Sequence, residues 1–139
     1  MKTLRARLTA ICTITLLLGT SVYMLREREA SHLAQFRYEY AIRLYASQNP
    51  AERLSALQLL NDLPNPQQAI ALIGRRLADA NLHNRLYAIH CLERMLGPVV
   101  ALPPDAVRDA SGATMMSNAA TDDYVQRWQA WFEANYPNA

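Results

Sequence analysis

Cysteine is almost absent from this chain. It occurs twice, as Cys12 and Cys91, and Cys12 falls within an apolar run near the amino terminus. The rest of the chain therefore has a single cysteine, which excludes a disulfide within one folded body. A domain without disulfides is compatible both with a reducing compartment and with an exported protein, so cysteine usage leaves the location open.

The residue patterns of common catalytic and metal sites are absent too. The sequence has no Cys-x-x-Cys, no His-Glu-x-x-His, no glycine-rich phosphate loop and no serine nucleophile motif. His83, His90, Cys91 and Glu93 are the one group of ligand-type residues. Zinc needs three or four convergent ligands, but helical neighbours such as His90 and Cys91 point about 100° apart. We interpret the group as surface histidines and a buried cysteine, and we expect no metal, no cofactor and no catalytic site.

A strong excess of basic residues is also missing. Lys2, Arg5 and Arg7 precede the apolar run, which leaves 11 of the 14 basic residues to balance the 12 acidic ones in the rest of the chain. Binding to phosphates requires a basic surface, so we expect no nucleic-acid partner. Hydrophobic residues, in contrast, make up 51% of the chain. That is enough for a packed core, and it argues against disorder throughout.

One long apolar run is present at the amino terminus. Residues 8–25 carry no charge, and a helix of that length extends about 27 Å, close to the hydrocarbon thickness of a bilayer. We predict a transmembrane helix or signal anchor over residues 8–25, preceded by a basic tail over residues 1–7. The alternative is a cleaved signal peptide, for which Gly19 and Ser21 supply a weak cleavage pattern.

The numbers of basic residues on the two sides of this predicted span are nearly equal, so they favour neither orientation strongly. Three basic residues precede it, and four follow it within about 20 residues, namely Arg26, Arg28, Arg37 and Arg43. A short basic start before an apolar run is typical of an export signal. We therefore expect a single-pass protein of the inner or plasma membrane, with its body on the non-cytoplasmic, periplasmic side.

The body of the chain contains an internal repeat. Residues 81–92 align with residues 49–60 at an offset of 32, and Asn, Arg, Leu, Ala and a final Leu coincide. Such self-similarity is typical of stacked helical units that bury their apolar faces against one another. Apolar residues at spacings of 3 and 4 predict four helices, over residues 27–47, 51–63, 66–80 and 83–96.

Proline, glycine and asparagine mark the ends of these predicted helices. Pro50 opens the second helix, Asn65 and Pro66 cap and open the third, and Gly97 ends the fourth. Gly74 lies inside the third helix, where glycine costs about 1 kcal/mol relative to alanine. We therefore predict a close helix contact at Gly74.

The second copy of the repeat carries the pattern Asp79-x-Asn81-x-x-x-Arg85-x-x-Ala88-x-x-x-Leu92. This pattern resembles the second helix of short HEAT repeats of the phycobilisome-lyase type. The resemblance covers most of residues 30 to 135. It implies an all-α fold in which residues 26–97 form a short α-solenoid of antiparallel helix pairs. In the first pair the helix over residues 27–47 packs with that over 51–63, and in the second the helix over 66–80 packs with that over 83–96.

The resemblance also implies a ladder in which a turn residue bonds an arginine six positions later. The residues that would form it here are Arg53, Asp79, Arg85 and Arg127. Ser47 replaces the acidic or amide residue in the first copy, and a third partial copy runs from Thr121 through Asp123 to Arg127. We expect Arg53 and Arg85 to bond turn carbonyls or turn residues of the neighbouring unit, and Arg75 to reach Asp79.

Residues 98–120 interrupt the helical pattern where the first helix of a third pair would fall. Long loops of this kind are usually functional or disordered. This segment is either an inert connector or a loop that contacts a partner through the adaptable side chains of Met115 and Met116.

Residues 121–139 are predicted to form a capping helix with aromatic residues on one face, Tyr124, Trp128, Trp131 and Phe132. These side chains either cover the end of the stack or bind a partner, since tryptophan is a frequent interface anchor.

These observations predict a non-catalytic, membrane-anchored protein–protein interaction module, an accessory or scaffold subunit of a membrane complex. The alternative is an exported small-ligand-binding or lyase-like HEAT-domain protein, with Tyr87, His90 and Cys91 as its candidate residues. A tetratricopeptide-like peptide receptor ranks lower, because the glycine, alanine and proline positions of that repeat do not match.

Overall fold

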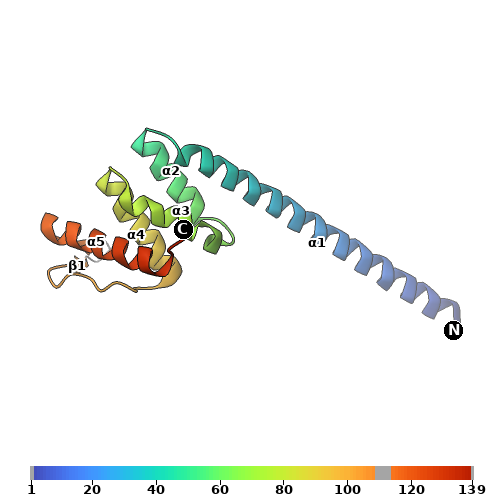
Figure 1. The fold of residues 1–139 in the computed structure, drawn as a ribbon. Helices are drawn as coiled ribbons and strands as arrows, with labels where there is room; N and C mark the ends of the chain where they lie inside the picture. Colours follow the sequence, from blue (N-terminus) through green and yellow to red (C-terminus); the bar gives the residue numbers. More distant parts are fainter. Residues whose placement is uncertain (1, 109–113, 139) are drawn as a thin grey trace. The chain divides into compact units, whose positions relative to one another are not determined.

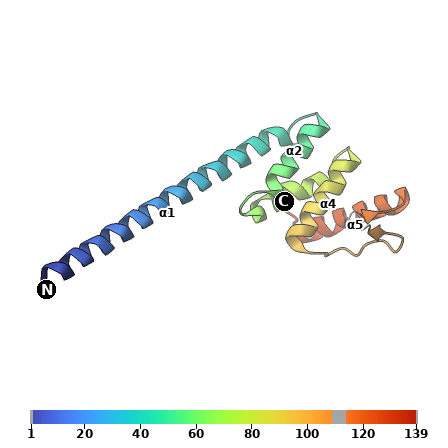
Figure 2. The same ribbon diagram turned by 180° about the vertical axis from the view of Figure 1, so that it is seen from behind.

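The computed structural model describes residues 2–108 and 114–138, and the side chains of residues 19–107 and 115–138. The chain divides into two compact units, Met1–Phe36 and Arg37–Ala139. Helices dominate in both, as Figures 1 and 2 show from opposite sides. The prediction of an all-α fold is confirmed, apart from a short two-stranded ladder in the second unit.

The first unit consists of helix α1 alone, which spans Lys2–Tyr45 and ends in the second unit. The predicted body helix over residues 27–47 is therefore not separate from the amino-terminal segment. No proline occurs before Pro50 to interrupt the helix. The exposed turn Val22–Leu25 is apolar, and the next four residues, 26–29, are exposed and charged.

Most of the predicted transmembrane segment lies outside the described side chains. Residues 8–18 are not among them, and residues 19–25 are. In the part of the chain that the structure describes, no helix is both long enough and apolar enough to cross a membrane. The span over residues 8–25, and the localisation that depends on it, remain predictions.

Helices α2 (Pro50–Asn61) and α4 (Leu82–Leu96) hold the two copies of the repeat and pack against each other. Asn49 and Asn81 each accept a hydrogen bond from a backbone N–H of the first turn, at 3.0 and 3.2 Å. The asparagine shared by the two copies is thus an N-cap in both.

The predicted helix ends at proline and glycine are confirmed for these two helices. Pro50 occupies the first helical position of α2, and Gly97 ends α4 with a φ of 83°. This φ lies in the left-handed region, which favours glycine over residues with a side chain.

The predicted third helix over residues 66–80 is not continuous. It consists of a 3₁₀ turn η1 (Pro66–Ala69), the short helix α3 (Ile70–Arg75) and a second 3₁₀ turn η2 (Arg76–Ala78). Asn65, the predicted cap, makes no capping hydrogen bond through its side chain, and Asp79 ends the segment in an extended conformation. Tight turns of this kind are frequent at helix ends.

The segment after α4 contains strands β1 (Val107–Arg108) and β2 (Thr114–Met115), which pair antiparallel. Among its described residues, 97–108 and 114–117, none is helical. Helix α5 then spans Asn118–Asn135 and begins three residues before the predicted start at 121. Its N-cap is Ser117, whose hydroxyl oxygen accepts from the Ala120 N–H at 3.2 Å.

The core of the second unit forms around α4, which packs against α2, α3, η2 and α5. From α5 it buries Tyr124, Trp128 and Phe132, which are 3%, 0% and 5% exposed. A β-carbon at Gly74 would overlap the ring of Phe132. This confirms the predicted close helix contact and explains why glycine occupies that position.

Several large apolar side chains of α1 are exposed. Leu33, Phe36 and Tyr40 are 52%, 66% and 48% exposed. In the second unit α1 buries Ala41 and partly buries Tyr45, whose hydroxyl donates to the Leu72 carbonyl at 3.0 Å. Ala41 and Tyr45 therefore supply the packing contact of α1 with the core of the second unit.

Candidate functional site

An ion pair between the half-buried Arg53 and the buried Asp79 joins the turns that precede the two copies of the repeat. Arg53 donates through Nε and Nη2 to the two carboxylate oxygens of Asp79, at 2.7 and 2.8 Å. Its Nη1 donates to the carbonyls of Ser47 and Gln48, at 3.1 and 2.8 Å. Arg53 therefore bonds carbonyls of the turn before α2 and the side chain of Asp79 in the turn before α4. Its contact with the carboxylate has the bidentate geometry that strengthens such pairs.

The carboxylate of Asp79 has two further donors, Arg76 at 3.1 Å and the Asn81 N–H at 2.9 Å. Burial by itself would raise the pKa of Asp79. The hydrogen bonds from Arg53 and Asn81 and the charges of Arg53 and Arg76 outweigh burial and lower the pKa to about 2. Asp79 is thus ionised at neutral pH and helps to hold the turns together.

Arg76, and not Arg75 as predicted, is the neighbouring arginine that reaches Asp79. Its guanidinium also donates to the Tyr45 carbonyl and lies 3.7 Å from the centre of the Tyr45 ring. Arg75 is exposed. Arg76 therefore links α1, η2 and the Asp79 turn through a cation–π contact and two hydrogen bonds.

The other two arginines of the predicted ladder have different surroundings. Asp79 accepts from Arg53 and Arg76 and not from Arg85, and the buried Arg85 Nε has no hydrogen-bond partner in the described part of the chain. Arg127 Nε lies 3.0 Å from the Asp123 carboxylate, and its Nη1 donates to the Ala101 carbonyl at 3.2 Å. The Arg127 pair is exposed and forms within one helix, unlike the Arg53 pair.

The six residues predicted to bind a partner differ in their accessibility. Tyr124, Trp128 and Phe132 are buried against the core, so a partner cannot reach them in this conformation. Trp131 is half-buried and contacts the Trp128 ring edge to face, with centroids 5.6 Å apart. Met115 is 64% exposed and Met116 is half-buried. A binding role remains a prediction only for Trp131, Met115 and Met116.

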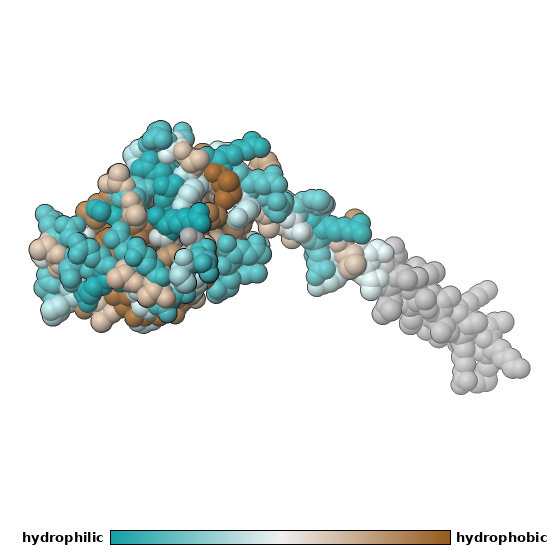
Figure 3. All heavy atoms as spheres, in the orientation of Figure 1, coloured by the Kyte–Doolittle hydropathy of each residue, from teal (hydrophilic) through white to brown (hydrophobic). Residues whose placement is uncertain are grey.

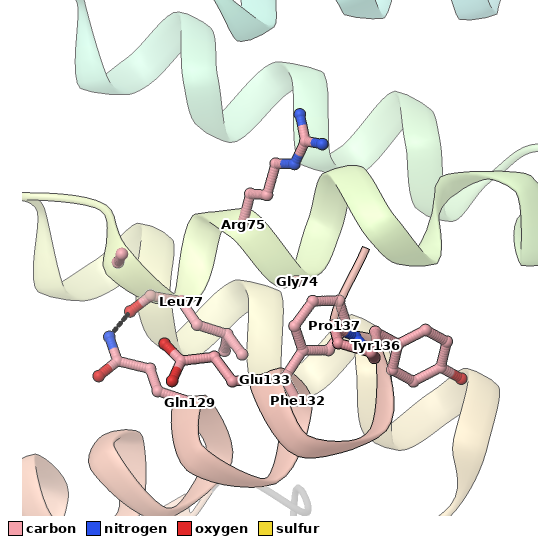
Figure 4. A pocket seen from close by; sticks show the side chains of 9 residues that line it. Gly74, Arg75, Leu77, Gln129, Phe132, Glu133, Tyr136 and Pro137 are labelled. Carbon is pink, nitrogen blue, oxygen red and sulfur yellow. Dashed lines mark hydrogen bonds between the residues drawn. The ribbon is translucent and has the colours of Figure 1, made fainter. Parts of the chain in front are cut away.

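A cavity of about 300 Å³ lies between α5 and the α3–η2 segment. Leu77, Phe132 and Tyr136 form its apolar wall, with the two rings stacked 4.9 Å apart. Figure 4 shows the Arg75 guanidinium directed away from these rings, and Gln129 bonded to the Leu77 carbonyl. The apolar wall suits an apolar group, and the lining also includes the polar residues Arg75, Gln129 and Glu133.

A second hollow, the α1/α2 groove, lies between the end of α1 and the outer face of α2, within the second unit. Its volume is about 540 Å³. Its lining combines apolar, neutral polar and acidic side chains and includes no basic one: Tyr40, Leu44, Glu52, Ser55, Gln58, Leu59 and Asp62.

The interpretation of the ligand-type residues as surface histidines and a buried cysteine is confirmed for His83, His90 and Cys91. His83 and His90 are exposed, and Cys91 is fully buried. Burial raises the pKa of the Cys91 thiol to about 12, so the nucleophilic thiolate is not populated at neutral pH. Among the described residues, no group of three or more His, Cys, Asp or Glu side chains is placed to hold a metal ion.

The chain matches no protein-family model, no curated protein and no solved structure.

Proposed function

We propose that this protein is a non-catalytic interaction module, held at a membrane by residues 8–25, that serves as an accessory or scaffold subunit of a membrane complex. The observation that supports this function is the exposure of Leu33, Phe36 and Tyr40. Their spacing of 3 and 4 places them on one face of α1. Large apolar side chains exposed together on one face are typical of surfaces that bind another protein.

The proposed membrane attachment is supported by the sequence on either side of residue 25. The run over residues 8–25 has no charge, and the first charges after it are on residues 26–29. Tyr23 stands near this border, where aromatic side chains are enriched in membrane proteins. Attachment to the same membrane as the partner would raise the effective concentration, so a modest interface would suffice.

The proposed architecture is a short HEAT-like solenoid. Two features support it: the asparagine N-caps at equivalent positions of α2 and α4, and the Arg53–Asp79 pair that links consecutive turns. Solenoid units stabilise one another through contacts between neighbours. Such stacks generally offer surfaces for macromolecules, in keeping with an interaction role.

The test is isolation of the full-length tagged chain from its native membrane in mild detergent, followed by mass spectrometry. We expect a stoichiometric membrane complex that Phe36→Asp disrupts and that Ser31→Asp, an exposed control on the opposite side of α1, leaves intact. Recovery of the chain alone, shortened near Ser21, would contradict both the anchor and the accessory role.

The alternative function, an exported small-ligand-binding or lyase-like protein, draws support from the cavity between α5 and the α3–η2 segment. An involvement of Cys91 would require the buried thiol to become exposed. A Cys91→Ser variant with an unchanged phenotype would count against that alternative.

A further inference from the structure

The α1/α2 groove has a regular arrangement along α2. Four of its lining residues, Glu52, Ser55, Leu59 and Asp62, follow one another at spacings of 3, 4 and 3. Residues at this spacing lie on the same helix face. An acidic side chain therefore stands at each end of the face, with Leu59 between them.

Both acidic side chains are exposed, and they lie ten positions apart in the sequence, which corresponds to about 15 Å along a helix. Asp62 is the C-cap of α2, a position at which the helix dipole disfavours a negative charge. The interaction of Asp62 with the helix dipole therefore does not stabilise α2. The lining holds no cation to compensate either carboxylate.

The floor between the two acids is apolar. Leu59 and Leu44 are half-buried, so each keeps part of its surface accessible in the groove. Figure 3 shows how polar residues, in teal, surround separate apolar patches, in brown, over one face of the molecule. An occupant of the groove must therefore bring apolar side chains for the floor and positive charge for both ends.

We propose that the α1/α2 groove binds a helix of a partner protein whose contact face carries apolar side chains between two basic side chains ten residues apart. This inference rests on the proposed interaction function and specifies its surface and partner chemistry. A groove between two helices accepts the apolar face of a third helix. Opposite charges at both ends fix the register of the incoming helix and speed its association.

The first test is site-specific photo-crosslinking in native membranes. The full-length chain carries a benzoylphenylalanine at Ser55, in the groove, or at His83, an exposed control on α4. We expect Ser55 to crosslink to a peptide with arginine or lysine on both sides of apolar residues, and His83 not to do so. A crosslink to a second copy of this chain, to lipid or to an acidic segment would overturn the proposal, as would no crosslink at Ser55.

The second test uses a defined probe, a synthetic helical peptide with leucines between two arginines ten residues apart. Binding to the full-length chain in phosphatidylcholine nanodiscs is measured by fluorescence anisotropy. Replacing both arginines of the peptide with glutamate should weaken binding by about tenfold or more, since each lost charge pair contributes about 1 kcal/mol. Equal binding of the two peptides would overturn the proposal.

A charge-reversed chain is the matched variant for both tests. Glu52→Arg combined with Asp62→Arg should abolish the crosslink at Ser55 and reverse the order of preference for the two peptides. A membrane complex that is recovered intact although Ser55 gives no crosslink would contradict the groove and leave the interaction function standing. Survival of the complex with Phe36→Asp while the crosslink at Ser55 persists would contradict only the role assigned to the exposed face of α1.

Discussion

The two sides of the helical body differ in how completely the chain covers its own apolar residues. On the α5 side, Trp128 and Phe132 are inserted against α4 and η2 and retain 0% and 5% exposure. On the side of α1 and α2, Tyr40 remains 48% exposed and borders an open groove. The chain thus buries large aromatic side chains under its own last helix on one side, whereas on the other side Tyr40 keeps about half of its surface exposed.

Truncation of Trp128 should have the largest effect. Trp128→Ala removes a fully buried indole from the contact between α5 and the core, so we expect a loss of about 3–5 kcal/mol in the free energy of unfolding. The measurement is denaturant unfolding of the full-length chain, followed by circular dichroism. Leu59→Ala, on the groove side, is the control and should cost about 1 kcal/mol, because Leu59 is only half-buried. Equal losses would contradict the difference between the two sides.

Protonation of Asp79 should have the second-largest effect on the stability of the fold. Its pKa is about 2 in the folded chain against an ordinary value of 3.8, so the ionised group stabilises the fold above about pH 4. That contribution is lost as the pH falls from about 4 to 2. We expect it to be about 1–2 kcal/mol, since solvent screens the partly exposed arginines. A pH series of unfolding curves measures it. Asp79→Asn should flatten this part of the profile, whereas a profile that Asp79→Asn leaves unchanged would contradict the role of the pair.

Gly74→Ala should have a smaller effect. The added methyl group would overlap the Phe132 ring and shift α5, at a cost of about 1–3 kcal/mol. The gain of about 1 kcal/mol in helix propensity offsets part of this cost, so we expect a net loss of about 1 kcal/mol. In a double-mutant cycle, Phe132→Leu should relieve the overlap, and the two changes should not be additive. Strict additivity would mean that Gly74 and Phe132 do not restrict each other.

Charge reversal in the groove should have the smallest effect on stability. Glu52→Arg combined with Asp62→Arg changes exposed side chains, so we expect the free energy of unfolding to stay within about 0.5 kcal/mol of the parent chain. The same unfolding assay measures it. A loss of several kcal/mol would show that these residues support the fold, and that the groove side is no more open than the α5 side.

Local chemistry in the sequence predicts the helix boundaries that depend on backbone geometry. Pro50 and Gly97 mark helix ends because each residue type suits a special backbone position, whereas Asn65, the predicted cap, makes no capping hydrogen bond. Gly74 likewise predicts a close contact. The start of α5 was placed three residues too late, although Ser117, a favourable N-cap, was a signal available in the sequence.

Contacts between distant residues were harder to predict. The apolar spacing predicted a helix over residues 27–47, but spacing alone does not distinguish a core-facing stripe from an exposed one, and Leu33 and Phe36 are exposed. The bonds of Arg53 to turn carbonyls and to the turn residue Asp79 agree with the expectation for that arginine. The second donor to Asp79 was missed, because Arg76 takes the place of the expected Arg75. One wall of the groove could be predicted from the sequence of α2, because Glu52, Leu59 and Asp62 share a helix face. The second wall could not, because it depends on where α1 ends.

The buried thiol of Cys91 gives this chain a built-in reporter of its own opening. The side chain has no exposed surface, and its pKa of about 12 keeps it protonated, so an alkylating reagent can modify it only when α4 separates from its neighbours. In a Cys12→Ser background, the rate of labelling would follow that opening in the full-length chain. A ligand that binds only the folded state of the second unit should slow the labelling in proportion to the fraction of chains that it occupies.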